Sequence, residues 1–154
     1  MREYIDASIF LGMHSKNEKI RIVCKNYIVR RLNNQISMSL EQIGICDNII
    51  WQYPREQQDA YYPFMDNLHT IMNICRVSYT EKDIREAIKN PQLQDLNISD
   101  RLTVAMVWVQ GAELYSVNPL LKCRDSVHFP EAGKELTFPL QLEKLYQQSL
   151  AVRI

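Results

Sequence analysis

The sequence predicts an α/β domain in which a central, mainly parallel sheet is flanked by helices in three layers. Three observations support this fold class. Short apolar stretches of strand type alternate with longer stretches of helical spacing, as in sheets whose strands are joined by helices. The length of 154 residues suits one domain, and the 46% share of hydrophobic residues is typical of globular proteins. The sequence contains no internal repeat and no linker, so residues 1–154 are expected to form a single domain.

The first half of the chain predicts two strand–helix units followed by a further helix. Its expected strands are residues 3–6 and 35–39. Its expected helices are residues 15–32, 40–51 and 55–75. Ser15 is the expected cap of the first helix, whereas Pro63 is expected to kink or split the last one.

The second half continues the alternation and ends in a helix. Its expected strands are residues 76–79, residues 113–117 and an edge strand at 134–138. Its expected helices are residues 81–90, 100–110 and 139–150. Thr80 and Asp83 have the spacing of a capping motif. Gly111 is the expected stop of an almost wholly apolar helix, which should therefore be buried.

The charges of the chain cancel, because 18 basic residues stand against 18 acidic ones. A neutral chain gives no electrostatic reason to expect binding to nucleic acid or to a membrane surface. The distribution is uneven, since residues 1–31 carry seven Lys or Arg, whereas residues 41–66 carry five acids against Arg55 alone. An anionic partner is therefore expected to meet the first helix.

The four cysteines lie apart in apolar segments, without the short paired spacing of metal ribbons or redox motifs. They are expected to be reduced core residues. No apolar run approaches the ~18–20 residues that a membrane span needs, and no leader opens the sequence. The sequence therefore predicts a cytoplasmic protein without a membrane partner.

Four polar side chains are expected at the edge of the sheet where its parallel strands end. Asp6 ends the first strand, Glu41 follows the second, Asp100 opens the buried helix and Asn118 follows a later strand. Carboxylates that meet at such an edge repel one another and stay ionised only with a cation between them. Oxygen ligands of this kind suit Mg²⁺ or Mn²⁺ and therefore phosphate ester chemistry.

These residues resemble the motifs of the PIN-domain nucleases, and the similarity runs from residue 4 to about residue 121. YIDASIFL resembles the opening strand and loop of that family, and SMSLEQIG places Glu41 at its second acidic position. Asp100 lies eighteen residues before Asn118, and the segment between them holds a buried helix and a glycine and ends in YSVN. This spacing is similar to that of many bacterial toxin members of the family, in which Asn is common at the fourth position.

The resemblance implies a three-layer PIN-like fold and a metal-dependent endonuclease, most simply an endoribonuclease that hydrolyses phosphodiesters with metal-activated water. It assigns Asp6, Glu41 and Asp100 to one or two Mg²⁺ or Mn²⁺ ions. It places Asn118 at the fourth catalytic position and gives Ser8 and Ser116 supporting roles. The partners that it implies are single-stranded RNA, an antitoxin protein and a second copy in a homodimer.

The sequence departs from the toxin pattern in one place. A further acid often follows the Asn by three residues in toxin members, whereas Leu121 stands there in this chain and Asp125 is a weak substitute. A catalytically degenerate PIN-like module, which binds RNA or a protein without cleavage, is therefore an alternative. Residues 122–154 would form a C-terminal strand and helix beyond the motifs.

Each acid also has a simpler interpretation. Asp6 could cap a turn, Glu41 could meet the positive end of a helix dipole, and Asp100 or Ser99 could cap a helix. A phosphoaspartate enzyme is disfavoured because Ser8 stands where such enzymes have an acid. A dinucleotide-binding domain is disfavoured because no GxGxxG follows the first strand.

Further residues are expected to assist the acids. Asn48 returns to the helix face of Glu41 after seven residues and is expected to support it, whereas Asp47 should point elsewhere. Lys16, Lys19 and Arg101 could contact a phosphate backbone, although charged helix residues are more often simply solvated.

Overall fold

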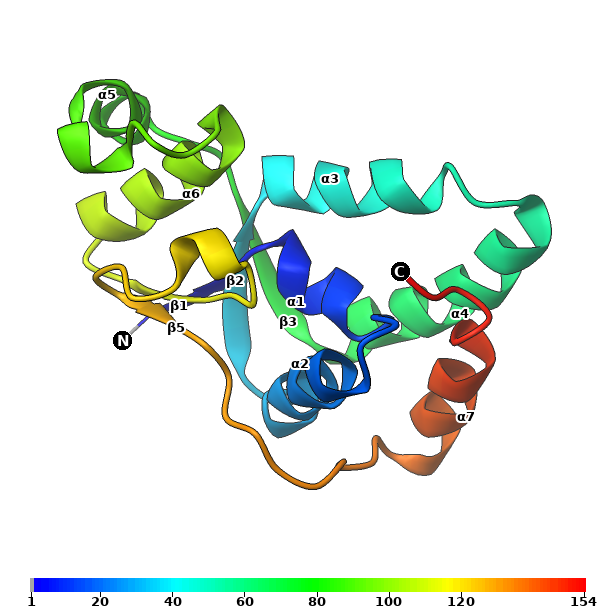
Figure 1. The fold of residues 1–154 in the computed structure, drawn as a ribbon. Helices are drawn as coiled ribbons and strands as arrows, with labels where there is room; N and C mark the ends of the chain where they lie inside the picture. The colour runs from blue at the N-terminus through cyan, green and yellow to red at the C-terminus, as the bar shows by residue number, and fades with distance from the viewer. Residues whose placement is uncertain (1) are drawn as a thin grey trace.

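The computed structural model describes residues 2–154 and has a parallel β-sheet at its centre (Figure 1). Among the described residues the sheet has five strands in the order β3-β2-β1-β4-β5. Every pair of neighbouring strands is parallel. The strands are β1 (Glu3–Ile5), β2 (Gln35–Ser39), β3 (Asn73–Val77), β4 (Glu113–Tyr115) and β5 (Val127–His128). The predicted α/β class with a mainly parallel sheet is confirmed.

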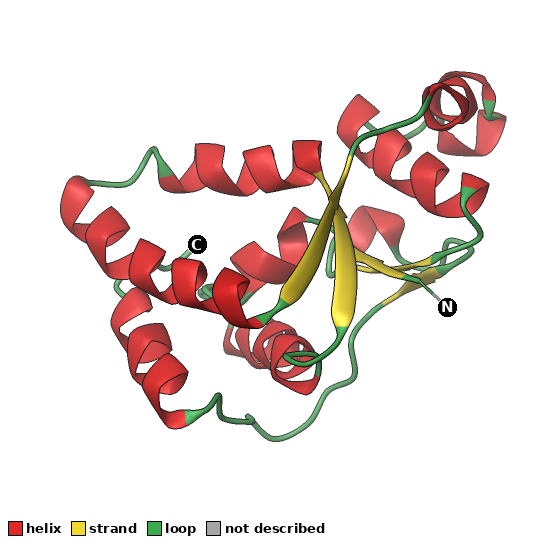
Figure 2. Ribbon diagram, turned by 180° about the vertical axis from the view of Figure 1, so that it is seen from behind, coloured by secondary structure: helices red, strands yellow, loops and turns green. Residues whose placement is uncertain are grey.

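Helices cover both faces of the sheet (Figures 1 and 2). They are α1 (Ala7–Gly12), α2 (Glu18–Arg30), α3 (Leu40–Ile50), α4 (Arg55–Ile71), α5 (Glu81–Lys89), α6 (Ile98–Val109) and α7 (Leu140–Ser149). Two short 3₁₀ helices, η1 (Pro91–Leu93) and η2 (Pro119–Leu121), follow α5 and β4. No helix among residues 2–154 is both long and apolar enough to cross a bilayer.

The alternation of side chains along β1 divides the core into two parts, because successive strand residues point to opposite faces. Tyr4, buried completely, packs with α5, α6 and β4 on one face. Ile5, 1% exposed, packs on the other face with residues of α1, α2, α3, α4 and α7. The short central strand therefore anchors helices on both sides and fixes the position of the residue that follows it, Asp6.

Most predicted elements are present, and their ends reflect local capping. Thr80 and Asp83 form the expected capping box at the start of α5, and Gly111 has a positive φ of 61° just after α6. Helix α2 is capped by Asn17 rather than by Ser15, because the Asn17 side chain accepts from the backbone of Lys19 and Ile20. The prediction of a cap at Ser15 was therefore wrong.

Three other expectations about secondary structure are corrected. The short helix α1 was not predicted. Helix α4 passes through Pro63 and ends at Ile71, and β3 occupies residues 73–77 instead of 76–79. The reason is the register of β3, since Ile74 pairs with Ile36 and all five residues of β3 oppose β2. Pairing over the full length of β2 outweighs the helical spacing of residues 72–75.

Residues 134–138 were expected to form an edge strand but form none. Side chains of α2 hold this segment in place of a strand ladder. The Asn26 amide donates to the Lys134 carbonyl at 2.8 Å and accepts from the Leu136 backbone at 2.7 Å. Arg21 and Lys25 pair with Glu135 at 2.7 Å each, and Lys25 also pairs with Glu143 at 3.0 Å. We call Arg21, Lys25, Glu135 and Glu143 the C-terminal clamp.

Candidate functional site

The predicted site residues surround an open cleft at the carboxyl edge of the sheet. Asp6 follows β1, Ser116 follows β4, and α3 begins where β2 ends. Strands β2 and β4 lie on opposite sides of β1, so the strand order reverses at the end of β1, which is where α/β sheets form ligand sites. The cleft has a volume of about 580 Å³ and is lined by residues that include Asp6, Ser8, Gln42, Asp100 and Asn118. We call it the sheet-edge cleft.

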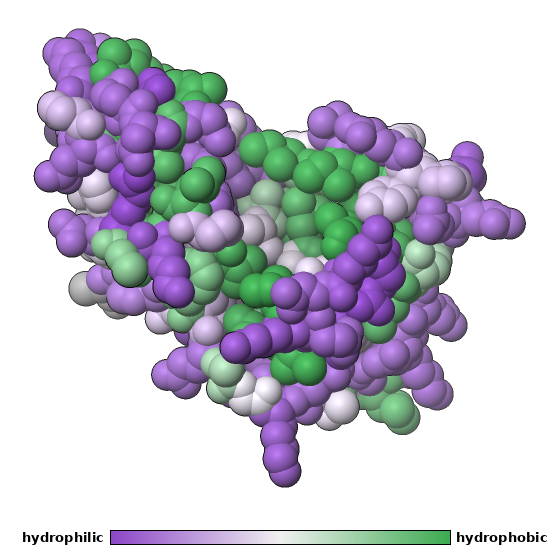
Figure 3. All heavy atoms as spheres, viewed as in Figure 1, coloured by the Kyte–Doolittle hydropathy of each residue, from purple (hydrophilic) through white to green (hydrophobic). Residues whose placement is uncertain are grey.

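Apolar side chains flank the polar floor of this cleft. Figure 3 shows the surface hollowed between the part formed by α5 and α6 and the part formed by α3, with hydrophobic residues along the hollow. Ile98 lines the cleft and is 54% exposed, and Leu120, next to the lining residue Pro119, is 63% exposed. Among residues 2–154, no lysine or arginine lines the cleft.

Asp6 is held in place at the floor of the cleft by burial and by three hydrogen bonds. It is 4% exposed and caps α1, because its Oδ1 accepts from the Ser8 backbone at 3.0 Å and from Ser8 Oγ at 2.5 Å. Its Oδ2 accepts from Ser116 Oγ at 2.6 Å. Burial raises the pKa of Asp6, and the charge of Asp100 raises it further, although the hydroxyl groups act in the opposite direction. The capping interpretation of Asp6 is therefore correct, and it is compatible with a site role.

The loop after β4 is tied to the same carboxylate. The backbone of Val117 donates to Ser8 Oγ at 3.0 Å, and that of Asn118 donates to Ser116 Oγ at 3.1 Å. Ser8 and Ser116 thus lie against Asp6, where the sequence placed them in supporting roles. Their hydroxyls join β1, α1 and the loop after β4 into one hydrogen-bonded unit.

Asp100 and Asn118 meet on the other side of the cleft. The Asn118 amide donates to Asp100 Oδ2 at 3.2 Å, and the Asn97 amide donates to the same oxygen at 3.1 Å. Asn97 caps α6, since its side chain accepts from the Asp100 backbone at 2.9 Å, so neither Ser99 nor Asp100 is the cap. Asp100 is thereby free to present its carboxylate to the cleft. Asp6 and Asp100 line one cleft, as we expected from their positions at the end of a strand and at the start of a helix.

Helix α3 presents Gln42 to the cleft in place of the expected Glu41. The Glu41 carboxylate accepts from Tyr79 Oη at 2.6 Å and from Ser99 Oγ at 3.0 Å, and Glu41 is not among the residues that line the cleft. Gln42 is 4% exposed; its Oε1 accepts from the Ala7 backbone at 2.8 Å and its Nε2 donates to Thr103 Oγ1 at 3.2 Å. The expected trio of Asp6, Glu41 and Asp100 does not come together.

The phase of α3 explains this difference. Ser39 caps the helix through the Gln42 backbone, so Gln42 is the third helical residue and points back toward the start of the helix. Neighbouring helical residues differ by about 100° in direction, so a shift of the helix start by one residue changes which side chain faces the cleft. The Ser-x-x-Gln spacing was the signal that could have identified Gln42.

The other assisting residues lie away from the cleft. Asn48 is exposed and does not line it, because it shares the face of Glu41 and not that of Gln42. Lys16 and Lys19 are exposed near the start of α2, outside the cleft. The Arg101 guanidinium donates to the carbonyls of Leu96 at 2.7 Å and Gln94 at 3.2 Å. None of the three expected phosphate contacts therefore lines the cleft.

The oxygen atoms of the cleft determine which metal ion it could bind. Among residues 2–154, no group of three or more His, Cys, Asp and Glu side chains converges on a point that could hold a metal ion. The cleft offers two carboxylates, from Asp6 and Asp100, whereas the Asn118 amide turns its nitrogen to Asp100 and its oxygen to the Leu120 backbone. Mg²⁺ commonly uses one or two carboxylates and completes its shell with water and substrate phosphate, so this donor set fits a hard divalent ion.

Comparison with known proteins supports the fold. A family model described as "Family of unknown function (DUF6190)" matches residues 1–154. A toxin–antitoxin complex from Klebsiella pneumoniae contains a chain of 14% identity and TM-score 0.58, with 84% of this chain and 98% of that chain covered. VapBC2 from Rickettsia felis, bound to a DNA fragment from its promoter, gives 13% identity and TM-score 0.61, with coverage of 86% and 100%. No curated protein matches the chain. At these identities the likeness shows the fold, which is PIN-like.

Proposed function

The chain belongs to DUF6190, a family of unknown function, and we propose that it is a metal-dependent endoribonuclease. The observation that carries this proposal is the pair of carboxylates, Asp6 and Asp100, in a cleft at the reversal point of the sheet. No basic side chain of residues 2–154 lines that cleft, so the fold itself supplies no cation opposite the two acids. Mg²⁺ or Mn²⁺ is the proposed cofactor.

Each polar residue of the cleft has a proposed role in binding the ion or in positioning a residue that binds it. Asp6 and Asp100 would hold the ion, and the Asn118 amide, which donates to Asp100, would keep that carboxylate directed into the cleft. Ser8 and Ser116 hold Asp6 in one orientation through three hydrogen bonds, which also restrict its freedom to rotate. A bound Mg²⁺ or Mn²⁺ supplies Lewis-acid chemistry that activates water and neutralises charge on a phosphodiester.

The proposed substrate is single-stranded RNA. Two carboxylates leave much of the coordination shell of a divalent ion unfilled, so phosphate oxygens of the substrate can take part in binding. The exposed apolar side chains of Ile98 and Leu120 beside the cleft offer contact surface for unpaired bases, which a duplex would keep stacked. Substrate binding and ion binding are then expected to strengthen each other.

The test is cleavage of single-stranded RNA by the purified protein with Mn²⁺. The wild type should cut, and Asp6→Asn and Asp100→Asn should each lower the rate by at least about 100-fold, since each removes an ion-holding carboxylate. Glu41→Gln is the matched control and should cut at the wild-type rate, because Glu41 does not line the cleft and its carboxylate is turned to Tyr79 and to the hydroxyl of the lining residue Ser99. Equal cutting by all four proteins would refute the assignment.

A specific observation favours a second candidate, a catalytically degenerate module that binds RNA or a protein without cleavage. Gln42 presents a neutral amide to the cleft in place of Glu41, and Leu121 stands where toxin members of the resembled family often have a further acid. Calorimetric titration with Mn²⁺ separates the candidates. Absence of uptake at millimolar concentration, with RNA still bound, would support the module over the enzyme.

Two protein partners are also proposed. One of the similar structures is described as a toxin–antitoxin complex, which supports an antitoxin-like protein as a partner for this chain. A homodimer is the second proposal, and light scattering of the purified chain tests it. A mass of one chain at all concentrations would exclude the dimer.

A further inference from the structure

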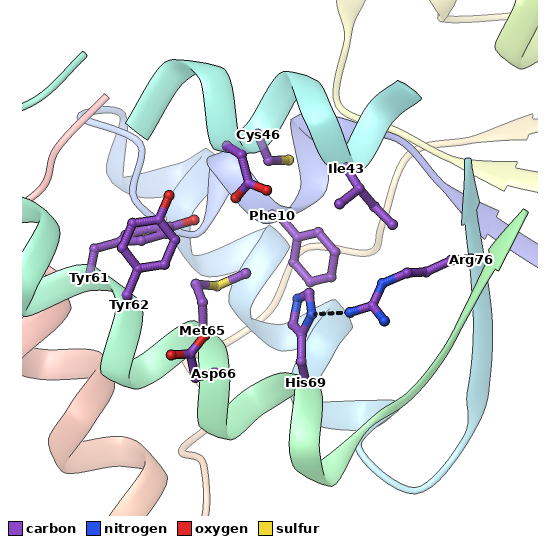
Figure 4. Close-up of a pocket in the computed structure, with 10 residues that line it drawn as sticks. Phe10, Ile43, Cys46, Tyr61, Tyr62, Met65, Asp66, His69 and Arg76 are labelled. Atoms are coloured by element: carbon purple, nitrogen blue, oxygen red, sulfur yellow. Dashed lines mark hydrogen bonds between the residues drawn. The ribbon is translucent and has the colours of Figure 1, made fainter. Parts of the chain in front are cut away.

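Helix α3 separates the sheet-edge cleft from a second cavity, which lies between α3 and α4 (Figure 4). Gln42 and Ile45 line the cleft, whereas Ile43, Cys46 and Asp47 line the second cavity. Its volume is about 250 Å³, slightly below the range of about 300–1,000 Å³ for drug-sized ligands, so it suits a smaller molecule. We call it the α3–α4 pocket.

The floor of the α3–α4 pocket is apolar. Phe10 from α1 is 2% exposed, and Cys46 from α3 and Met65 from α4 are 8% exposed each. Figure 4 shows these side chains between α3 and α4, with Tyr61 and Tyr62 at one end and Arg76 at the other. The floor can therefore bind an aliphatic chain, and the side chains at the two ends of the pocket determine which polar group that chain carries.

The tyrosine end carries a polar atom without a partner among residues 2–154. Tyr61 is 2% exposed and lines the pocket. The Tyr62 hydroxyl is buried and lacks a hydrogen bond of standard geometry. Burial raises the pKa of both phenols, and the nearby carboxylate of Asp47 adds to it. A buried hydroxyl without a partner, such as that of Tyr62, costs free energy, which a ligand at this end would recover.

The carboxylates of the pocket are also unpaired. None of the ion pairs among residues 2–154 includes Asp47 or Asp66. Arg76 does not neutralise them, since it lies at the far end and donates to His69 Nδ1 at 3.2 Å. A guanidinium can only donate, so His69 is the neutral acceptor of that bond.

We propose that the α3–α4 pocket binds a primary ammonium group carried by an aliphatic chain. An ammonium has three N–H donors, and the tyrosine end offers three acceptor groups, the Asp47 carboxylate and the two phenol oxygens. The aromatic faces of Tyr61 and Tyr62 attract a cation further. The chain of the ligand would lie on Phe10 and Met65. Asp47 and Asp66 are exposed, and they would attract a cationic ligand but not a neutral or anionic one.

This ligand chemistry has two sources, a free alkylamine or the lysine side chain of a protein. Calorimetric titrations with 1-aminopentane and with Nα-acetyl-lysine amide distinguish them, and 1-pentanol serves as the neutral probe of the same shape. Binding of 1-aminopentane alone would indicate a free amine, and tighter binding of the lysine derivative would indicate a protein. Both results support the proposal, whereas equal binding of 1-pentanol would overturn it.

Two variants test the assigned residues. Asp47→Asn and Tyr61→Phe should each weaken amine binding by at least about tenfold, because each removes one acceptor of the ammonium. Tyr61→Phe removes one hydroxyl and keeps the ring, so it should change the stability of the unliganded protein by less than about 1.5 kcal/mol. Asp59→Asn is the control, because Asp59 pairs with Arg55 outside this pocket. Absence of heat with either amine at millimolar concentration, or wild-type affinity in Asp47→Asn, would overturn the proposal.

The proposal is independent of the proposed nuclease function. Asp47 does not line the sheet-edge cleft, so Asp47→Asn should cut RNA at the wild-type rate. If the protein cleaves RNA but binds neither amine, the amine site is refuted and the proposed nuclease function is not affected.

Discussion

The C-terminal clamp and the sheet-edge cleft differ in the groups that surround their carboxylates. In the clamp, two carboxylates meet two cations, and Lys25, completely buried, contacts both Glu135 and Glu143. In the cleft, Asp6 and Asp100 meet hydroxyl and amide groups, and no basic side chain of residues 2–154 lines the space between them. Burial raises the pKa of Asp6, whereas Arg21 and Lys25 lower that of Glu135 to about 2.

The difference indicates which charges serve the fold and which remain available for a ligand. A carboxylate whose counter-charge lies within the same chain is neutralised once the chain folds, and its contribution is to stability. A buried carboxylate held only by neutral donors keeps a negative potential that a cation can satisfy. The cleft is therefore the better candidate for a metal, although it is short of the three acids that the sequence led us to expect.

The largest expected effect comes from breaking the clamp. Lys25→Met leaves Glu143 and part of Glu135 without a counter-charge and should lower the free energy of unfolding by about 3–5 kcal/mol. Urea denaturation measures this. Lys144→Met, at an exposed position on α7, should stay within about 0.5 kcal/mol of the wild type. A similar small loss for Lys25→Met would show that the clamp contributes little.

The next effect comes from giving the cleft a third acid. Gln42→Glu places a carboxylate near Asp6 and Asp100 and removes a donor to Thr103, so the metal-free protein should lose about 1–3 kcal/mol of stability. Mn²⁺ should bind at least about tenfold more tightly and should restore the lost stability. Thermal unfolding with and without Mn²⁺ tests both parts, and a variant that Mn²⁺ fails to stabilise would count against a cation site here.

The clamp and the cleft should also differ in pH dependence. The pKa of Glu135 is about 2 in the folded chain against a usual value of 4.5, chiefly because Arg21 donates to it. Its stabilising contribution, about 1–2 kcal/mol, is therefore present above pH 4.5 and is lost as the pH falls from 4.5 toward about 2. Glu135→Gln should flatten this acid limb in denaturation curves, and an unchanged limb would contradict the assignment. Asp6 affects stability in the opposite sense. Because its pKa is raised in the folded chain, its ionisation lowers the free energy of unfolding as the pH rises.

The smallest effect is expected at Glu41. Glu41→Gln weakens two charge-assisted hydrogen bonds, from Tyr79 and Ser99, and should cost about 1 kcal/mol of stability. Mn²⁺ binding should remain at the wild-type level, because the lost charge lies outside the cleft lining. A clear loss of Mn²⁺ affinity in this variant would restore Glu41 to the site and weaken the distinction from Gln42.

The fold and part of the site could be predicted from the sequence because they depend on local patterns. Strand and helix periodicity gave the parallel sheet, and the position of Asp6 after β1 followed from the length of that strand. Gln42 could not be found in this way, since the choice between adjacent residues depends on the Ser39 cap that sets the phase of α3. Residues 134–138 were mistaken for a strand because Asn26, their hydrogen-bond partner, lies more than 100 positions away in the chain.

The most direct test of the central claim is a calorimetric titration of the purified chain with Mn²⁺. The proposal predicts binding by the wild type and a loss of at least about tenfold in affinity in both Asp6→Asn and Asp100→Asn, since each removes one of two charged ligands. Wild-type affinity in both variants, or no uptake by any protein at millimolar Mn²⁺, would contradict the claim that these two carboxylates hold the ion.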